Sequence, residues 1–152
     1  MNYWLMKSEP EAFSIDDLQA MPEQTEHWDG VRNYQARNMM RDDMKVGDMV
    51  FFYHSNCKEP GIVGTMQVVR EGYPDFTAFD PESKYFDEKS DPTNPRWVMV
   101  DIKFVRTMKR LISLSELKQY DELDGMQLLR RGNRLSITPL SEEQWTFILS
   151  RE

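Results

Sequence analysis

Residues 49–70 read MVFFYHSNCKEPGIVGTMQVVR, and this stretch decides the class of fold that the sequence predicts. The run at 49–54 is short, apolar and rich in aromatic residues, which is typical of a β-strand. The residues EPG at 59–61 turn the chain, and the run at 62–70 leads back as a second strand. Gly64, inside the second run, suits a bulge or a sharp bend. The stretch therefore predicts two antiparallel strands with an irregularity in the second.

Further strands are predicted on both sides of this pair. In WVMVDIKFVRT at 97–107, alternate side chains suit opposite faces of a sheet, which predicts a strand. Shorter strands are expected at 2–6 and 134–140. Between the strands predicted at 62–70 and 97–107, the turn-rich and acidic segment 73–96 is expected to form an extended surface loop. Several mostly antiparallel strands with short helices around them predict an α+β fold, a small mixed β-barrel with peripheral helices.

Four short helices are predicted from capping patterns. Three begin with a serine that stands between two hydrophobic residues able to contact each other, which is a specific signal for a helix start. In the second and third of these, Glu116 and Gln144 stand where a capping box closes. A fourth helix is expected at 34–41, with Asn33 as its cap. The three capping serines are Ser14, Ser113 and Ser141.

Length and composition favour one folded domain over residues 1–152. No apolar run approaches the roughly 20 residues that a membrane-spanning helix needs, so no membrane partner is expected. The first residues lack the pattern of a secretory signal. The single Cys57 excludes an internal disulfide, and one cysteine with two histidines gives no structural zinc pattern. We therefore expect no metal, no cofactor and a reducing, cytoplasmic location.

The net charge of −7 argues against a protein that binds nucleic acid by bulk phosphate neutralisation. Basic residues nevertheless gather in three segments, 32–46, 96–110 and 126–137. These segments form one patch or scattered solvated faces, and the sequence leaves both alternatives open. The acidic loop at 73–95 supports a further alternative, an interaction module that docks a protein partner through this loop.

Catalysis is the weaker interpretation of the sequence. His54 and Cys57 lie three positions apart, which allows a Cys–His nucleophile pair in an enzyme that acts on a nucleotide or nucleic acid. However, Cys57 has no activating neighbour in the sequence, and the paired carboxylates stand in helix first turns or exposed turns. The sequence contains no Walker-type phosphate loop, dinucleotide fingerprint or HExxH motif. We therefore expect a non-catalytic protein and keep the enzyme as an alternative.

A binding function uses the stretch HWDGVRNYQARNMM at 27–40 better. Aromatic side chains stack on nucleobases for about 1–3 kcal/mol each, amides read a base edge, and arginine holds a phosphate. Trp28 precedes an Asp-Gly turn signal that is expected to hold the indole outside regular structure. Asn33, Tyr34 and Arg37 follow within one helical segment. The stretch therefore predicts a site for a nucleobase with its phosphate.

A second group of candidates stands at the two ends of the turn after residues 49–54. Tyr53, His54, Ser55 and Asn56 leave the strand end together. Pro60 and Gly61 begin the next strand, where a flat ligand can approach the backbone closely. Together they predict a small chamber with a few polar groups.

Several motifs together resemble one known family. YWLMKSEP (3–10), WDGVRNYQARN (28–38), FFYHSN (51–56), PGIVG (60–64) and RLSITP (134–139) run in the order typical of EVE-domain proteins. The EVE domain belongs to the PUA-like superfamily, which also contains the YTH readers. The resemblance covers essentially the whole chain, so it implies a single EVE domain over 1–152.

The resemblance implies a PUA-like antiparallel barrel with helices packed outside it. It also implies recognition of a modified base, methylated or hydroxymethylated, in DNA or RNA, through a pocket lined by aromatic rings that encloses the base swung out of its strand. By similarity to YTH domains, Lys7, Ser8 and Trp28 occupy the positions of the binding residues. No cofactor is implied.

The leading hypothesis combines the residues with the resemblance. Trp28 stacks the modified base, with Tyr53 or Trp97 as the second ring. The expected edge-reading residues are Ser8, Asn33 and Asn56, and the expected phosphate-binding residues are Arg37, Arg96, Arg130 and Arg134.

Overall fold

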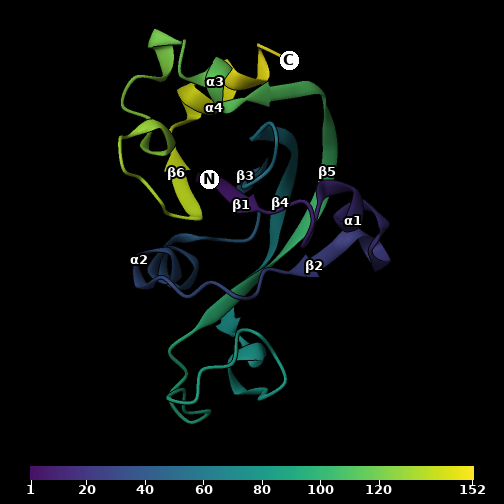
Figure 1. The fold of residues 1–152 in the computed structure, drawn as a ribbon, viewed down its shortest axis with the longest axis vertical. Helices are drawn as coiled ribbons and strands as arrows, with labels where there is room; N and C mark the ends of the chain where they lie inside the picture. Colours follow the sequence, from purple (N-terminus) through teal and green to yellow (C-terminus); the bar gives the residue numbers. More distant parts are fainter.

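One six-stranded sheet organises the chain in the computed structural model, which describes residues 1–152 (Figure 1). The strands follow the spatial order β2-β5-β4-β3-β1-β6. β1 and β3 run parallel, whereas every other neighbouring pair is antiparallel. The strands are β1 (Tyr3–Ser8), β2 (Thr25–His27), β3 (Met49–His54), β4 (Gly61–Pro74), β5 (Val98–Ser113) and β6 (Ile137–Leu140).

Short helices and single turns surround the sheet. None of the helices combines the length and the apolar character that a membrane crossing requires. The α-helices are α1 (Ile15–Ala20), α2 (Tyr34–Asn38), α3 (Leu114–Leu117) and α4 (Glu142–Leu149), and the other turns are η1 (Pro22–Gln24), η2 (Met39–Asp43), η3 (Phe76–Phe79), η4 (Asp121–Leu123) and η5 (Gln127–Leu129).

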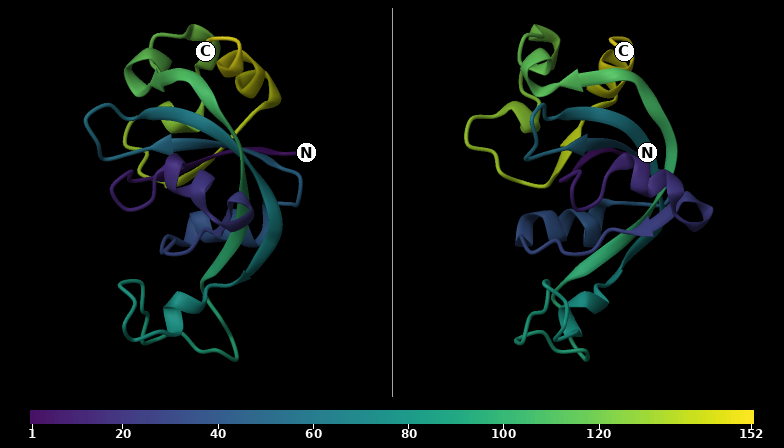
Figure 2. Two further views of the ribbon diagram at one scale, coloured as in Figure 1. Left: turned by 90° about the vertical axis from the view of Figure 1, so that its right-hand side faces the viewer. Right: turned by 45° about the vertical axis from the view of Figure 1, so that its right-hand side comes forward.

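The strand predictions hold for the central strands and fail mainly at their ends. β3 has the predicted bounds, but β4 and β5 extend beyond theirs, because the two strands pair with each other along most of their length. Figure 2 shows this long pair reaching from the end that carries α3 and α4 to the loop between β4 and β5. β2 was not predicted, since three residues are too few to show an alternating pattern.

The α+β class is confirmed, and the structure shows an open sheet. β2 and β6 are its two edges and pair with no further strand, so closure into a barrel is not confirmed. The irregularity predicted at Gly64 is present, because the register of β4 against β5 shifts between Ile62 and Gly64. A Cβ atom at Gly64 would lie 2.6 Å from the carbonyl oxygen of Arg106. The glycine therefore allows the two backbones to approach at this bend.

All four predicted helix caps are present. Ser14, Ser113 and Ser141 each accept a hydrogen bond from the backbone N–H three residues later, and Asn33 does the same for Ala36.

The lengths and capping boxes of these helices follow the predictions only in part. The predicted helix at 34–41 instead ends at Asn38 and continues as the wider turn η2. Gln144 closes a capping box as predicted. Glu116 closes no box, because its carboxylate instead accepts from Arg110 and Tyr120.

The core consists of two clusters on opposite faces of the sheet. Alternate residues of β3 belong to different clusters: Val50 and Phe52 join the first, and Phe51 and Tyr53 join the second. A strand that is buried on both faces needs a continuous apolar run, which explains the sequence MVFFY. Trp28 lies in the first cluster and therefore places the candidate site on that face.

Candidate functional site

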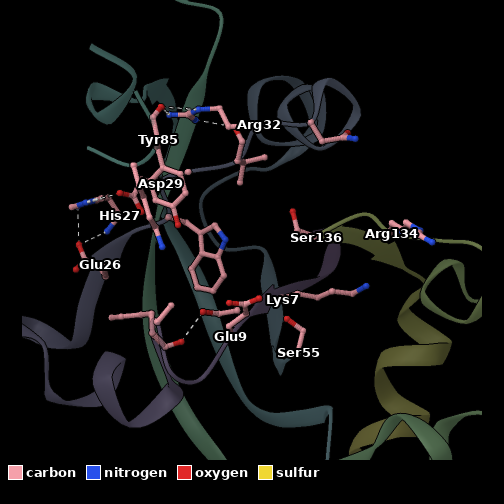
Figure 3. A pocket seen from close by; sticks show the side chains of 18 residues that line it. Lys7, Glu9, Glu26, His27, Asp29, Arg32, Ser55, Tyr85, Arg134 and Ser136 are labelled. Carbon is pink, nitrogen blue, oxygen red and sulfur yellow. Dashed lines mark hydrogen bonds and ion pairs between the residues drawn. The ribbon is translucent and has the colours of Figure 1, made fainter. Parts of the chain in front are cut away.

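A cavity of about 780 Å³ opens beside the first core cluster. Its walls come from the end of β1, the segment that runs from β2 toward α2, the chain before β6, and the loop between β4 and β5 (Figure 3). The cavity thus joins segments that are far apart in the sequence. The predicted site residues that line it are Lys7, Ser8, Trp28, Asn33, Ser55 and Arg134.

Trp28 is more deeply buried than its turn signal predicts. Only 8% of the residue is exposed, and its ring packs edge to face on Phe52 at 5.5 Å and on Phe13 at 6.5 Å between ring centroids. Trp28 does lie outside regular structure, as predicted, but its ring is part of the first core cluster. The remaining exposed part of Trp28 lines the cavity, so the core holds the ring as a rigid part of the wall.

The Asp-Gly turn after Trp28 is shaped by a contact with the distant loop. Gly30 has φ +81°, a conformation that side chains other than glycine rarely adopt. The ring of Tyr85 lies directly against it, because a Cβ atom at Gly30 would be 2.5 Å from the ring carbon Cζ. Tyr85 also lines the cavity. The turn therefore supplies a flat surface for an aromatic wall that the sequence analysis did not predict.

A buried ion pair fastens the same loop to the turn. Arg32 Nη1 donates to Asp75 Oδ2 at 3.0 Å, and Arg32 Nη2 donates to the carbonyl oxygen of Tyr85 at 2.7 Å. Asp75 is fully buried and also accepts from Gly30 N at 2.9 Å. Burial alone would raise the pKa of Asp75, but hydrogen bonds from Thr77, Gly30 and Arg32 together hold it below its ordinary value. These contacts fix the position of Tyr85.

One edge of the cavity is acidic. Glu26 and His27 form an ion pair of 2.7 Å, and His27 Nε2 lies 3.9 Å from Asp29 Oδ2. Burial is the main cause that raises the pKa of Asp29. No other residue donates a hydrogen bond to the Asp29 carboxylate, whereas Glu26 accepts one from His27 N at 2.9 Å. Asp29 is thus a half-buried acceptor without a donor.

The opposite edge is basic. Figure 3 shows Lys7 and Arg134 across the cavity from Glu26, His27 and Asp29. Neither Lys7 nor Arg134 has a carboxylate within 4.0 Å, and burial lowers the pKa of the Lys7 ammonium. The cavity therefore has two chemically different edges, one with hydrogen-bond acceptors and one with free cations.

A second set of predicted residues forms a separate group. Tyr34 stacks on Trp97 at 4.8 Å and 24°, and the Arg37 guanidinium lies 4.8 Å from the Tyr34 ring centroid. Arg37 donates to the carbonyl oxygen of Arg96 at 2.8 Å. Trp97 donates through Nε1 to Asp87 at 2.8 Å. None of these side chains lines the cavity, so they do not form the second ring of a base stack there.

Of the residues predicted to form a chamber at the end of β3, Ser55 alone lines this cavity. Tyr53 points to the second core cluster, because side chains alternate along a strand, and is 3% exposed. His54 Nε2 accepts from Ile15 N at 3.2 Å, and Asn56 donates to Glu9 at 2.8 Å. These side chains hold the strand end and its turn in place.

Pro60 and Gly61 also have a structural role. The carbonyl oxygen of Pro60 accepts from Leu114 N at 2.9 Å. A Cβ atom at Gly61 would lie 2.8 Å from Ser113 Cα, so β5 fills the space above this glycine. A flat ligand therefore has no room at this backbone.

The basic segments do not form one patch. Arg106 and Arg110 of the middle segment are paired with Glu152 and Glu116. Arg37 and Arg96 lie in the separate aromatic group described above. The first and last segments each bring one cation to the cavity, Arg32 and Arg134.

Several residues of the cavity wall were not predicted as site residues, among them Asp29, Arg32, Tyr85 and Ser136. The sequence places Asp29 only in a turn and Arg32 only in a charged segment. One signal for Tyr85 was present: the loop 73–96 contains several aromatic residues, which in an acidic surface loop indicates that some of them pack on the domain.

Solved structures of known proteins share this fold along the whole chain. A crystal structure of human THYN1 protein in complex with 5-methylcytosine containing DNA is 52% identical, covers 99% of this chain and 97% of its own, and superposes with a TM-score of 0.95. A protein from Pseudomonas syringae is 50% identical, covers 98% of both chains and has a TM-score of 0.93.

Relatives known from their sequences correct one expectation. Thymocyte nuclear protein 1 of Rattus norvegicus is 54% identical over 99% of this chain and 74% of its own length, and the Homo sapiens protein is 52% identical over the same shares. Their name assigns them to the nucleus, so the expectation of a cytoplasmic location is contradicted. The inference from Cys57 failed because the nucleus and the cytosol are both reducing, and a missing disulfide does not distinguish them.

The family model of the EVE domain matches residues 2–151. This range contains every strand and helix of the chain and all residues that line the cavity. Together with relatives above half identity over nearly the full chain, the match shows that this chain belongs to the EVE domain family.

Proposed function

We propose that this chain is a non-catalytic module that binds DNA carrying 5-methylcytosine and encloses the modified base in the cavity beside Trp28. The observation that carries the proposal is an indole, fixed by the core, in the wall of a cavity of about 780 Å³. Ligand sites for small molecules typically have volumes of about 300–1,000 Å³, which a flipped base fits. The similar human protein in complex with 5-methylcytosine containing DNA supports the choice of ligand.

The free-energy balance suits an unstacked base. Swinging a base out of a duplex costs a few kcal/mol, and stacking on one aromatic ring returns about 1–3 kcal/mol. A methyl group adds about 1–3 kcal/mol through apolar contact and shape. The expected result is a preference for the methylated base of about 10- to 200-fold, with plain cytosine still bound weakly.

The two edges of the cavity orient the nucleotide. Lys7 and Arg134 attract the sugar-phosphate backbone, whereas Asp29 repels it and can accept from an amino group of the base. Cytosine carries such an amino group at its N4 position. The base therefore enters with its amino edge toward Asp29 and its backbone toward Lys7.

The proposal is tested with variants of two buried tryptophans, Trp28 in the cavity wall and Trp145 outside it. Trp28→Phe keeps a ring but removes part of the indole face, and Trp28→Ala removes the stack. We expect the affinity for DNA with one 5-methylcytosine to fall about 5- to 150-fold in Trp28→Ala, less in Trp28→Phe, because a stack that is removed is worth about 1–3 kcal/mol. Fluorescence anisotropy with methylated and unmethylated duplexes measures this directly.

Trp145→Phe is the matched control, because Trp145 is 7% exposed in the other core cluster and lines neither edge of the cavity. Thermal melting of all variants separates weaker binding from impaired folding. Equal affinity of folded Trp28→Ala and the unchanged protein for methylated DNA would remove the stack from the proposal. The same sequence as RNA shows whether the sugar matters.

The enzyme alternative gains no support from the geometry. Its candidate base, His54, accepts from Ile15 N through Nε2 and packs edge to face on Phe52 at 5.4 Å. Its role is to join the end of β3 to the start of α1.

A further inference from the structure

A second, smaller cavity of about 320 Å³ lies next to the first, and Lys7 lines both. The wall of the second cavity comes from the ends of β1 and β3, from α3, and from the chain between η5 and β6. We call it the basic cavity, defined by Lys7, Tyr53, Lys118, Arg130, Arg131 and Asn133. Its remaining lining is three leucines and a glycine.

The charge of the basic cavity is unusual for this chain. Four cations line it and no carboxylate does, although the chain as a whole has a net charge of −7. None of the four takes part in an ion pair. Elsewhere arginines are neutralised by acids, as Arg41 is by Asp42 at 2.8 Å and Arg110 by Glu116 at 2.6 Å. The fold therefore keeps these positive charges free at one place.

Lys7 is the residue that joins the two cavities. Its ammonium pairs with no carboxylate, donates no hydrogen bond within the chain, and lies 5.8 Å from the centroid of the buried Tyr53 ring. Partial burial lowers its pKa, since desolvation disfavours the charged form. A half-buried cation without a partner is stabilised by an anion that arrives with a ligand.

We propose that the basic cavity binds a backbone phosphate of the nucleotide next to the base that enters the first cavity. This inference rests on the proposed function, because Lys7 then stands between the base and the phosphate. Arg130 and Arg131 are both exposed and offer guanidinium groups that match the geometry of phosphate oxygens.

Binding at two points with a fixed separation has a consequence for the ligand. A base cavity alone accepts a base whichever way the 5′-to-3′ direction of its DNA strand runs across the protein. A phosphate cavity on one side of the base cavity allows only one of these two strand directions. The basic cavity also adds affinity without regard to sequence, because phosphates carry no sequence information. Affinity from the basic cavity and preference for methylation from the first cavity are therefore separable.

The experiment removes the two arginines together. In Arg130→Gln/Arg131→Gln, the affinity falls for methylated and unmethylated DNA by the same factor, and their ratio stays unchanged. The slope of log affinity against log salt becomes shallower by about one unit for each phosphate that the variant no longer neutralises. Anisotropy titrations between about 50 and 200 mM salt, a range over which such slopes are roughly linear, measure both quantities.

The matched control is Lys103→Gln/Lys109→Gln. This double variant removes the same charge from two exposed residues of β5 that line neither cavity and belong to no ion pair. Its salt slope is expected to change less than that of the arginine variant, because neither lysine lines the basic cavity and exposed charges are screened by salt. A control that changes the slope as much as the arginine variant would reduce the effect to net charge and overturn the inference.

Inorganic phosphate distinguishes a strand phosphate from a free one. Amide signals of Gly132 and Asn133 that shift with methylated DNA but not with millimolar phosphate support a strand phosphate, and shifts with both support a general anion site. Unchanged affinity and slope in the arginine variant would overturn the basic cavity as a phosphate site. Failure of the proposed function looks different, since the unchanged protein then shows no preference for methylated DNA while the salt slope still reports on the basic cavity.

Discussion

At the scale of single residues, the identity of one carboxylate bears on selectivity. Thymine carries the same 5-methyl group as 5-methylcytosine, so an apolar contact with the methyl does not distinguish them. The two bases differ at position 4, where cytosine has an amino donor and thymine an oxygen acceptor. Asp29 lines the cavity and lacks a donor, whereas Glu9 and Glu26 already accept from Asn56 and His27. Asp29 is therefore the acceptor available for the amino group.

We predict that Asp29→Asn loses the distinction between 5-methylcytosine and thymine. Single-stranded oligonucleotides that differ only in this base avoid differences in pairing. The unchanged protein is expected to prefer 5-methylcytosine at least about tenfold, since a hydrogen bond to a charged group contributes about 1.5–3 kcal/mol. In the variant this ratio falls toward one, as measured by calorimetry or anisotropy. Asp124→Asn, in an exposed turn, is the control, and a preserved ratio in Asp29→Asn contradicts the assignment.

At the scale of elements, the bend in β4 determines how the helix α1 lies on the sheet. Gly64 faces both the backbone of β5 at Arg106 and the side chain of Ile15, the first residue of α1. The close approach of three elements at one residue explains why the chain has a glycine inside a strand, where it otherwise weakens packing.

Gly64→Ala is expected to destabilise the fold by roughly 1–3 kcal/mol, the usual effect of an overpacked core. Urea unfolding at neutral pH measures the free energy. Adding Ile15→Val to this variant relieves the clash with the side chain but leaves the carbonyl oxygen of Arg106 in place, so the double variant recovers only part of the stability. Full recovery, or no destabilisation at all, would show that the close approach to the backbone is unimportant.

At the scale of the whole molecule, the loop between β4 and β5 is part of the site. The protein-interaction alternative treats this loop as a free surface, but Asp75 and Arg32 fasten it to the turn that follows Trp28, and Tyr85 closes over Gly30. Figure 1 shows the loop at the end of the molecule away from α3 and α4. Its attachment thus completes the cavity from a distant part of the chain.

Asp75→Asn is expected to destabilise the protein by roughly 3 kcal/mol, because the variant leaves Arg32 without its charged partner in a partly buried place. The pKa of Asp75 lies below the ordinary value of 3.8. The pair therefore stabilises the fold fully above that pH, and its contribution disappears as the pH falls through the lower folded-state pKa. Unfolding curves at neutral pH and at a series of acidic pH values down to about 3 check this.

Asp42→Asn is the control for this prediction. Asp42 also pairs with an arginine, but the side chains of Arg41 and Asp42 are 48% and 52% exposed, so the free energy of unfolding is expected to stay nearly unchanged. Methylated-DNA binding falls in Asp75→Asn and not in Asp42→Asn. Equal destabilisation in the two variants would contradict the role of burial.

Short-range patterns were sufficient for much of the fold. A cap or a strand depends on residues within a few positions, so the sequence correctly predicts Ser14, Ser113 and Ser141 as caps and the run 49–54 as a strand. Part of the lining was also predicted, because Lys7, Ser8, Trp28, Asn33 and Arg134 stand in motifs of the resembling family and do line the cavity.

The sequence by itself determined the α+β class, the helix caps, the family and the presence of Trp28 near a turn, since each depends on local pattern or on similarity along the chain. Only the tertiary structure decided which faces these residues occupy. Tyr53 and Trp97 turn away from the cavity, and Tyr85 reaches it by packing on Gly30, a residue far earlier in the chain. The physical reason is that a cavity is formed between distant segments, and their arrangement follows from how the whole chain packs rather than from any stretch of it.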